Sequence, residues 1–248
     1  MIETRALQKS FGPQRVLNGV DLRIEKGEAV VIIGRSGGGK SILLKHLIGL
    51  LQPDAGDVLV DGESIGRLNE RGLLRVRRKF GMLFQSAALF DSLSVKENVA
   101  FALRRDHLLT EKEIDAKVAA ALEMVDLRGI EAKMPAELSG GMRKRVGLAR
   151  AIIYQPEFIL YDEPTTGLDP IVADSIDKLI RRISERLKVT SIAVTHDMRS
   201  ACCIGRRILM LHEGRIYFTG TPDATMKSDD PIVHQFVSGI SDPKEQYF

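Results

Sequence analysis

The chain has 248 residues, of which 44% are hydrophobic and 28% are charged, and its formal net charge at pH 7 is +3. This composition is typical of a globular protein rather than a disordered chain, and so small a net charge predicts no nucleic-acid partner. No run of 18 apolar residues occurs, so we expect no membrane-spanning helix. The length suits one large α/β domain, or a core with an inserted subdomain.

The cysteines and the first residues bear on the compartment. Cys202 and Cys203 are adjacent and are the only cysteines, so they cannot form a disulfide framework. We interpret both as buried small hydrophobic residues, with a redox role as the alternative, and expect a reducing compartment such as the cytosol. Residues 1–5 lead directly into structure without an apolar segment, so we expect no secretory signal.

Alternating and continuous apolar patterns predict the elements. Residues 1–33 alternate apolar and polar positions, which predicts antiparallel strands, and their last part, 29–33, is a continuous β-branched run typical of a buried strand. Further strands are expected at 57–60, 158–161, 190–195, 207–211 and 215–218, and helices at 43–48, 111–126 and 171–187. Strand and helix segments thus flank a helix-rich middle at about 86–155, which predicts an inserted helical subdomain. Residues 221–248 are polar and interrupted by prolines, and are expected to form a tail.

A phosphate-binding loop follows the strand at 29–33. The pattern G-x-x-x-x-G-K-S is formed by Gly34, Arg35, Ser36, Gly37, Gly38, Gly39, Lys40 and Ser41. Strand, glycine-rich loop and helix is the context that this motif requires, whereas a flexible turn is the alternative. Glycines leave the backbone N–H groups free to face phosphates, and the following helix adds its positive dipole end. We expect Lys40 to reach the β- and γ-phosphates and the Ser41 hydroxyl to bind Mg²⁺.

Two carboxylates end the strand at 158–161. Asp162 and Glu163 would lie at the carboxyl edge of an α/β sheet, where such folds bind ligands. We expect Asp162 to hold Mg²⁺ and Glu163 to orient and polarise the attacking water, against the alternative of two solvated acids.

A second glycine pair precedes a helix expected to begin near Arg143. The segment reads Leu138-Ser139-Gly140-Gly141-Met142. Ser139 is a good N-cap, and the glycines expose backbone N–H groups at a helix N-terminus, which is a second potential anion site. By itself this string indicates no more than a capped helix.

Taken together, these motifs resemble the ATP-binding subunit of ABC transporters along essentially the whole chain. The matching segments, in order, are 34–41, Gln85, 138–142, 161–163, 167–169 and His196. The resemblance implies an α/β P-loop NTPase fold: a RecA-like core with an antiparallel β subdomain and an inserted helical subdomain, together spanning residues 1–220. It also implies ATP hydrolysis with Mg²⁺ as the cofactor.

The same resemblance implies roles for individual residues. Two cassettes of this family close head to tail, so Ser139, Gly140 and Gly141 would contact the γ-phosphate bound by the partner's Lys40. Gln85 would bind Mg²⁺ and sense the helical subdomain, and a neutral amide oxygen suits this hard cation. His196 would bind the γ-phosphate and Asp169 would communicate across the dimer. Phe11 stands where the family stacks an aromatic ring, more often tyrosine, on adenine, with a buried core phenylalanine as the alternative.

One departure from the family pattern narrows the resemblance. Met142 stands where most members have glutamine, and 138–145 and 84–90 are similar to the ATPases of Mla-type phospholipid transport systems. Such an ATPase would work as a homodimer on the cytoplasmic face of the inner membrane. Its partners would be an integral membrane permease, an MCE-type lipid-binding protein and a small regulatory subunit.

Other interpretations stay open at this point. The cargo could be an amino acid, a lipoprotein or a metabolite. A soluble ABC ATPase of translation or DNA repair would carry two cassettes or a long coiled coil, and neither is present. A regulatory module that does not hydrolyse ATP usually lacks a catalytic residue, whereas Lys40, Glu163 and His196 are all present.

The basic clusters 75–79 and 143–145 are expected to be solvated faces, with lipid headgroups or permease acids as alternative partners. The end of the tail, 231–248, could dock on a partner subunit or fray.

Overall fold

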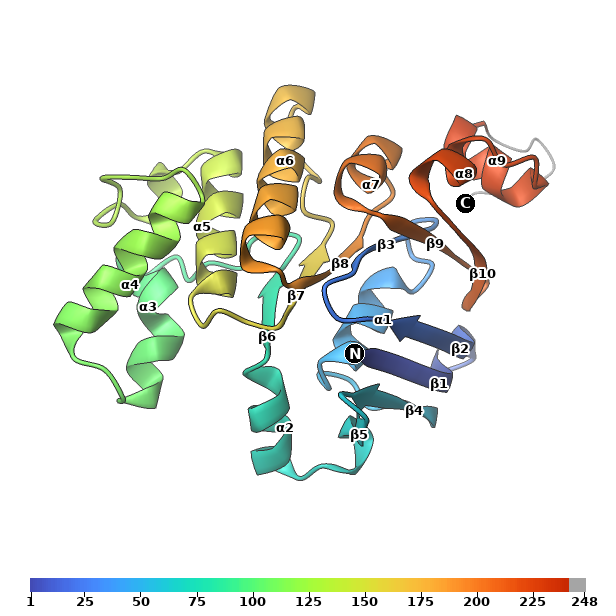
Figure 1. The fold of residues 1–248 in the computed structure, drawn as a ribbon, viewed down its shortest axis with the longest axis horizontal. Coiled ribbons are helices and arrows are strands. Elements are labelled where there is room, and N and C mark those ends of the chain that lie inside the picture. The colour runs from blue at the N-terminus through green and yellow to red at the C-terminus, as the bar shows by residue number, and fades with distance from the viewer. Residues whose placement is uncertain (241–248) are drawn as a thin grey trace. The chain divides into compact units, whose positions relative to one another are not determined.

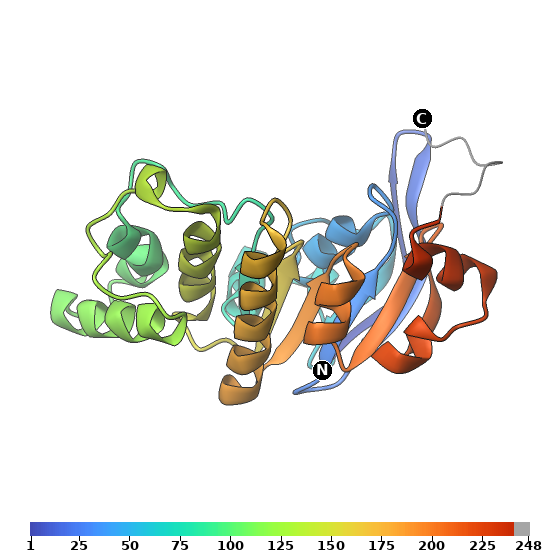
Figure 2. The same ribbon diagram turned by 90° about the horizontal axis from the view of Figure 1, so that it is seen from above.

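The computed structural model describes residues 1–240. The described chain forms two compact units. The first unit combines Met1–Leu68 with the chain from Val194 onward, and the second is Asn69–Ala193. Figures 1 and 2 show the elements of both units as ribbons in two perpendicular views.

An antiparallel sheet opens the first unit. Its strands run in the order β2-β1-β4-β5. They are β1 (Ile2–Phe11), β2 (Gln14–Ile24), β4 (Ala55–Val60) and β5 (Glu63–Ser64), followed by the 3₁₀ helix η1 (Ile65–Arg67). Ile2 lies opposite Ile24 on one side and Val60 on the other, and all three side chains are buried. The alternating pattern produces β1 and β2 because successive side chains point to opposite faces. The expectation of antiparallel strands over 1–33 was wrong for 29–33, which form a parallel strand of the other sheet because both of its faces are buried.

The first unit also contains three strands of the central sheet. β3 (Ala29–Ile33) pairs in parallel with β9 (Arg207–His212), which forms an antiparallel hairpin with β10 (Arg215–Gly220). Every residue of β3 is buried, as its continuous apolar run predicts. Helix α1 (Lys40–Leu47) follows β3, and α7 (Met198–Ile204) packs against β3. The strands and hairpin expected from the sequence in this unit are therefore confirmed.

Two short helices follow β10, in the segment where no helix was expected. They are α8 (Pro222–Met226), which packs on β9 and β10, and α9 (Pro231–Ser238), which packs on α8. Each begins with a proline directly after a capping side chain: Thr221 accepts a hydrogen bond from Ala224 N–H, and the Asp230 carboxylate accepts two. Proline is favoured at the first helical position, so these prolines start helices instead of breaking the chain. Residues 241–248, the end of the expected tail, lie outside the described residues.

The second unit has its own three strands and a group of helices. The strands run in the order β8-β7-β6, and β6 pairs in parallel with β7. Their bounds are β6 (Phe80–Leu83), β7 (Phe158–Asp162) and β8 (Thr190–Val194); the long helices beside them are α5 (Gly140–Ile152) and α6 (Pro170–Leu187). Helix α5 packs on β6 very closely, because a Cβ on Gly81 would lie 2.2 Å from the carbonyl oxygen of Ala151.

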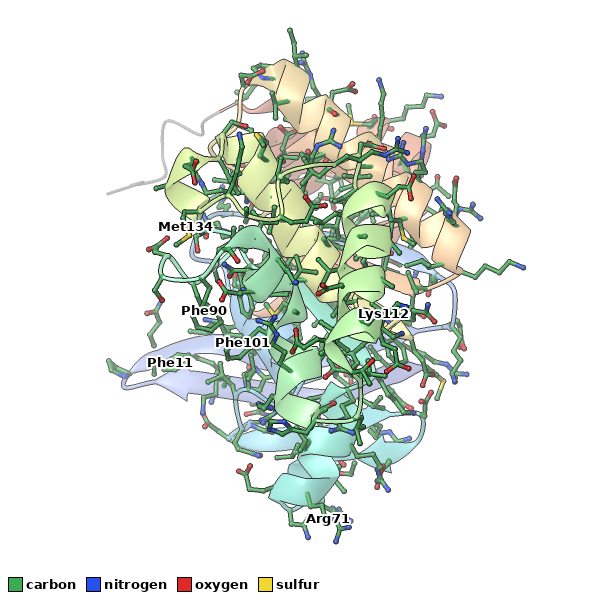
Figure 3. All side chains as sticks on the ribbon, turned by 90° about the vertical axis from the view of Figure 1, so that its left-hand side faces the viewer. Phe11, Arg71, Phe90, Phe101, Lys112 and Met134 are labelled. Atoms are coloured by element: carbon green, nitrogen blue, oxygen red, sulfur yellow. The ribbon has the colours of Figure 1, made fainter. Side chains whose placement is uncertain are left out.

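The remaining helices of the second unit lie mainly between β6 and α5 in sequence. They are α2 (Glu70–Arg77), α3 (Val95–Asp106), α4 (Glu111–Met124) and the 3₁₀ helix η2 (Pro135–Glu137). Helices α3, α4 and α5 pack on one another. Ser94 and Thr110 begin α3 and α4 with full capping boxes, and α4 corresponds to the helix expected at 111–126. Phe90 and Phe101 remain exposed, with ring centroids 4.7 Å apart (Figure 3).

Two expectations concern burial and membrane insertion. Cys202 and Cys203 lie on α7 and are only half-buried, so the prediction that both are buried was wrong. An amphipathic surface helix of seven residues exposes part of most positions, which the apolar character of cysteine does not reveal. Within residues 1–240, no helix is long and apolar enough to cross a membrane.

Candidate functional site

The loop between β3 and α1 gathers most of the predicted phosphate-binding residues. Gly34 leaves β3 with φ +153°, and a Cβ there would lie 2.4 Å from the carbonyl oxygen of Leu211 on β9. Gly39 precedes α1 with φ +94°, and a Cβ there would lie 2.9 Å from Val16 Cγ1. Neither position accepts another residue without displacing backbone or a buried side chain. Gly34 and Gly39 are therefore required by the close packing of β9 and β2 against the loop.

Lys40 folds back over the loop. Its side chain is only 5% exposed, and Nζ donates hydrogen bonds to the carbonyl oxygens of Gly34 at 2.7 Å and Arg35 at 2.9 Å. The ammonium is thus held at the centre of the loop, where its charge faces any anion that the surrounding backbone N–H groups bind. Ser41 follows in the first turn of α1 and is half-buried.

The exposed part of the loop touches the end of the first unit. Arg35, Ser36 and Gly37 are exposed and Gly38 is half-buried. The Arg35 guanidinium donates to Gln235 Oε1 on α9 at 3.4 Å. The helix that the sequence did not predict therefore lies within reach of the phosphate loop.

Two other predicted residues belong to the same unit. Phe11, at the end of β1, is 46% exposed, and the Lys9 ammonium lies 5.6 Å from its ring centroid. An exposed aromatic ring beside a cation is available for stacking, so the alternative of a core phenylalanine is excluded (Figure 3). His196 is exposed on the loop between β8 and α7, directly before Asp197, which caps α7.

Asp162 and Glu163 lie where the sequence predicts, at the carboxyl end of β7 in the second unit. They are 6% and 8% exposed, so the alternative of two solvated acids is excluded. Glu163 has the left-handed backbone angle φ +48°, which turns the chain sharply out of the strand. Its Oε2 accepts a hydrogen bond of 3.1 Å from Thr166 Oγ1. Buried carboxylates on a strained turn are typical of a functional site rather than of a solvent-facing surface.

Helix α5 brings a buried lysine to both Gln85 and Glu163. Gln85 is itself exposed, but its carbonyl oxygen accepts a hydrogen bond from Lys144 Nζ, which also donates to the Glu163 carbonyl oxygen at 3.2 Å. Burial lowers the pKa of Lys144, while the charges of Asp162 and Glu163 oppose that shift. No sequence motif indicated this position of Lys144.

The structure also corrects the interpretation of the cluster that contains Lys144. Residues 143–145 were expected to form a solvated charged face, and this was wrong for Lys144, whereas Arg143 is exposed and Arg145 is half-buried. Lys144 is buried, Arg143 donates to the Leu138 carbonyl oxygen at 2.6 Å, and Arg145 contacts the Val125 carbonyl and Asp126. The tertiary packing of α5 places three consecutive cations among backbone carbonyls, which no local charge count reveals. In the other cluster, Arg78 pairs with Asp106 at 2.9 Å.

The segment 138–142 forms a capped helix start, as predicted. Ser139 Oγ accepts a hydrogen bond of 3.3 Å from Met142 N–H, and α5 begins at Gly140 rather than near Arg143. A Cβ on Gly141 would lie 2.6 Å from Val172 Cγ1, so α5 and α6 are in close contact here. Asp169 is the N-cap of α6 and accepts from Ile171 and Val172 N–H groups at 3.1 and 3.0 Å.

Each unit therefore assembles a defined part of the predicted site. The first unit holds 34–41, Phe11 and His196; the second holds Gln85, Asp162, Glu163, 139–141 and Asp169. The proposed Mg²⁺ ligands would be a hydroxyl, an amide oxygen and a carboxylate, which are the oxygen donors that this ion prefers. No group of three or more His, Cys, Asp or Glu residues within residues 1–240 could bind a metal by itself.

Comparison with known proteins supports the interpretation of these motifs. The family model described as "ABC transporter" matches residues 17–166. The chain is 43% identical over 242 residues to the intermembrane phospholipid transport system ATP-binding protein MlaF of Haemophilus influenzae, covering 98% of this chain and 92% of that protein. It is 42% identical over 238 residues to a probable ribonucleotide transport ATP-binding protein, mkl, of Mycobacterium leprae, covering 96% and 69%.

A solved structure of another protein has a fold similar to that of this chain. The dimeric, post-hydrolysis ATP-binding cassette MJ0796 bound to ADP and Pi matches 90% of this chain and 99% of its own, with a TM-score of 0.82 and 32% identity. The expected P-loop NTPase fold is thereby confirmed.

Proposed function

This chain belongs to the ABC transporter ATP-binding family, and we propose that it is the ATP-hydrolysing subunit of a transporter that moves phospholipid between membranes. The lipid cargo is supported by the relative named for phospholipid transport, which is similar to this chain over almost the full length of both proteins. The sequence 138–145, with Met142 in place of glutamine, supports the same assignment. The geometry that carries the ATPase function is the loop at 34–41, with Lys40 held at its centre.

A second cargo deserves a test because of another relative. The mycobacterial protein is named for probable ribonucleotide transport and is 42% identical, although the chain spans only 69% of its length. The ATPase chemistry would be the same with either cargo. The experiment that follows from the proposal must therefore identify the transported molecule as well as the hydrolysis.

The first unit would bind the triphosphate. We assign Phe11 to adenine stacking, Lys40 to the β- and γ-phosphates, and the backbone N–H groups of 34–41 to the phosphate oxygens. Ser41 would provide a hydroxyl to Mg²⁺, which would neutralise charge between the β- and γ-phosphates when bound. His196 would donate a hydrogen bond to a γ-phosphate oxygen and stabilise the charge that develops there.

The second unit would activate water. Glu163 would accept a proton from the attacking water, and the oxygen of that water would form a bond to the γ-phosphorus. At the same time, the bond from the γ-phosphorus to the β-γ bridging oxygen would break. The products are ADP and inorganic phosphate. The burial of Glu163 and its hydrogen bond from Thr166 Oγ1 support this role, because they hold the carboxylate in one orientation, as a positioned base requires. Asp162 and Gln85 would supply the carboxylate and amide oxygens to Mg²⁺.

We further propose that the chain works as a homodimer. The dimeric state of the cassette MJ0796 supports this. Ser139, Gly140 and Gly141 would then contact the γ-phosphate bound by the partner's Lys40, and Asp169 would communicate across the interface. The start of α5 supports that role, because its backbone N–H groups and helix dipole favour an anion.

The proposal includes partners and a location. The subunit would bind an integral membrane permease at the cytoplasmic face of the inner membrane, with an MCE-type lipid-binding protein and a small regulatory subunit in the same assembly. The name of the Haemophilus relative, a transport-system ATP-binding protein, supports a permease. We assign residues 1–220 to the ATPase domain, with a helical subdomain at about 86–155 and a C-terminal segment from 221 onward. The packing of α3, α4 and α5 on one another supports the subdomain.

Purification of the native complex tests the proposal. The tagged full-length chain is extracted from membranes in mild detergent, and the co-purifying proteins and lipids are identified by mass spectrometry. The complex is then reconstituted into liposomes with fluorescent phospholipid, with the Glu163→Gln variant as the control. Phospholipid movement that needs ATP and is lost in the variant supports the proposal. A permease that moves ribonucleotide instead refutes the lipid cargo, and absence of any membrane partner refutes the transport function.

A further inference from the structure

Lys144 is a buried cation whose position the roles assigned so far do not explain. It is 5% exposed on α5, whereas charged side chains are rarely buried without a specific partner. Its neighbour Arg143 is exposed and donates to a carbonyl of the preceding turn. Because burial of an ammonium is unfavourable, the surrounding oxygen atoms must compensate for the lost water.

The hydrogen bonds of Lys144 go to the part of the second unit that carries the proposed catalytic residues. Its Nζ donates to the carbonyl oxygens of Gln85 and Glu163, the second at 3.2 Å. The charges of Asp162 and Glu163 lie close enough to favour the protonated ammonium. One side chain thus connects the two segments that carry the proposed magnesium ligands and the proposed base.

The Glu163 backbone needs such a contact. Its φ of +48° lies in the left-handed region, which a non-glycine residue adopts only when its surroundings hold it there. The Lys144 ammonium bonds the carbonyl oxygen of this residue, so it acts on the backbone that aims the carboxylate. Thr166, which donates to the carboxylate itself, acts on the other end of the same residue.

The segment that contains Gln85, residues 83–88, is also held in place by residues of α5. Ala87 and Ala88 both have left-handed backbone angles, φ +62° and +47°, and their carbonyl oxygens accept hydrogen bonds of 2.7 Å from Arg150. Gly147, between the two cations on α5, lies so close that a Cβ there would be 2.8 Å from Leu83 Cδ1. Two cations and one glycine of α5 therefore hold this segment against the helix.

The same helix begins with the second anion site. Ser139 caps α5, and Lys144 follows five residues later, a rise of about 7.5 Å along a helix. A rigid helix of 13 residues moves as one body, so a displacement of its N-terminus also displaces Lys144.

We propose that Lys144 is a positioning residue that couples the N-terminus of α5 to the backbone of Gln85 and Glu163, so that contact of Ser139, Gly140 and Gly141 with a γ-phosphate aligns the base. This inference rests on the proposed function, in which Glu163 activates the water. Lys144 Nζ bonds backbone carbonyl oxygens, so it would act through the backbone and not directly on the water or the nucleotide. Its loss should therefore lower kcat and leave the affinity for ATP nearly unchanged.

Three substitutions separate donor, charge and volume at this position. Lys144→Arg keeps the charge and the donors, Lys144→Gln keeps a donor without the charge, and Lys144→Met keeps only the approximate volume. We expect kcat near wild type for arginine, an intermediate loss for glutamine, and a loss on the order of 10²-fold for methionine, as for a misplaced catalytic group. The control Lys112→Met makes the same change at an exposed position of α4 and should alter nothing (Figure 3).

Two independent measurements on the full-length chain test the positioning role of Lys144. ATPase kinetics with Mg-ATP give kcat and KM, and a fluorescent ATP analogue gives the affinity. Amide hydrogen exchange of the peptides covering 83–90 and 160–168 reports how well ordered these two segments are, and it requires no ATP hydrolysis. Exchange in both peptides should rise for Lys144→Met and stay at the wild-type rate for Lys144→Arg.

The outcomes distinguish this inference from the proposed function. Unchanged kcat and exchange in all three variants, or a fall in ATP affinity equal to the fall in kcat, would overturn the role of Lys144. If the wild-type chain bound no ATP and hydrolysed none, the proposed function would fall; altered exchange in the two peptides would then still establish the structural coupling. If Lys144→Met does not fold, Lys144→Gln takes its place in the test. The kcat of Lys144→Gln must then be lower than that of Lys144→Arg.

Discussion

Replacement of Glu163 by glutamine gives the sharpest test of the catalytic assignment. The two side chains have nearly the same volume, and the buried position of Glu163 has room for an isostere. Glutamine retains an oxygen that accepts the 3.1 Å hydrogen bond from Thr166 Oγ1. We therefore expect the fold, the thermal stability and the affinity for ATP to be preserved.

Turnover should respond very differently. A neutral amide cannot accept a proton from water, and a positioned general base contributes about 10² to 10⁴-fold to a rate. The expected loss in kcat corresponds to about 2.7 to 5.4 kcal/mol in the activation free energy. Because the closed state would form but not react, the variant should also accumulate as an ATP-bound dimer.

Three assays measure these effects together. Phosphate release gives kcat, a fluorescent ATP analogue gives the affinity, and size-exclusion chromatography with light scattering gives the ATP-dependent mass. The matched control is Glu157→Gln, an exposed glutamate just before the same strand. Turnover by Glu163→Gln at the wild-type rate would refute the assignment of the base, and equal losses in both variants would point to the strand rather than the carboxylate.

Three further predictions follow from the geometry. Phe11→Ala removes the exposed ring proposed to stack on adenine, and should weaken ATP binding by about 1–3 kcal/mol in a fluorescence titration, whereas Phe101→Ala should not. Ser139→Arg should abolish dimer-dependent turnover while ATP binding to the monomer stays nearly intact; equal loss of both would contradict a site built from two chains. Gly81→Ala places a Cβ 2.2 Å from the Ala151 carbonyl oxygen and should lower the free energy of unfolding by about 1–3 kcal/mol in urea; an unchanged midpoint would show that α5 is not packed as tightly on β6 as described.

Local sequence was sufficient wherever a residue acts through its immediate neighbours. The loop at 34–41 was predicted because its glycines, lysine and serine lie within eight positions, and Gly34, Gly37 and Gly39 have positive backbone φ angles that favour glycine. The cap at Ser139 and the strand that ends at Asp162 were predicted for the same reason. Motif order then indicated the family and, through it, the expected roles of Gln85 and His196.

The helices after β10 show a limit of local interpretation. Pro222 and Pro231 were taken as interruptions, although proline after a capping threonine or aspartate also begins a helix. These helices have five and eight residues, and helices that short are marginal by themselves in water. Their packing on β9, β10 and each other decides the outcome, and that packing is not visible in the segment itself.

Lys144 marks the boundary between what the sequence determines and what the tertiary structure decides. The sequence places it in a run of three basic residues, and such a run usually faces solvent. Only the close approach of α5 to β6, which Gly81 and Gly147 permit, brings its ammonium between the carbonyl oxygens of Gln85 and Glu163. Those residues are 59 and 19 positions away along the chain. The sequence by itself therefore determined the nucleotide loop, the caps and the family, because these depend on neighbouring residues, whereas the partners of a buried charge depend on which distant backbones the fold brings together.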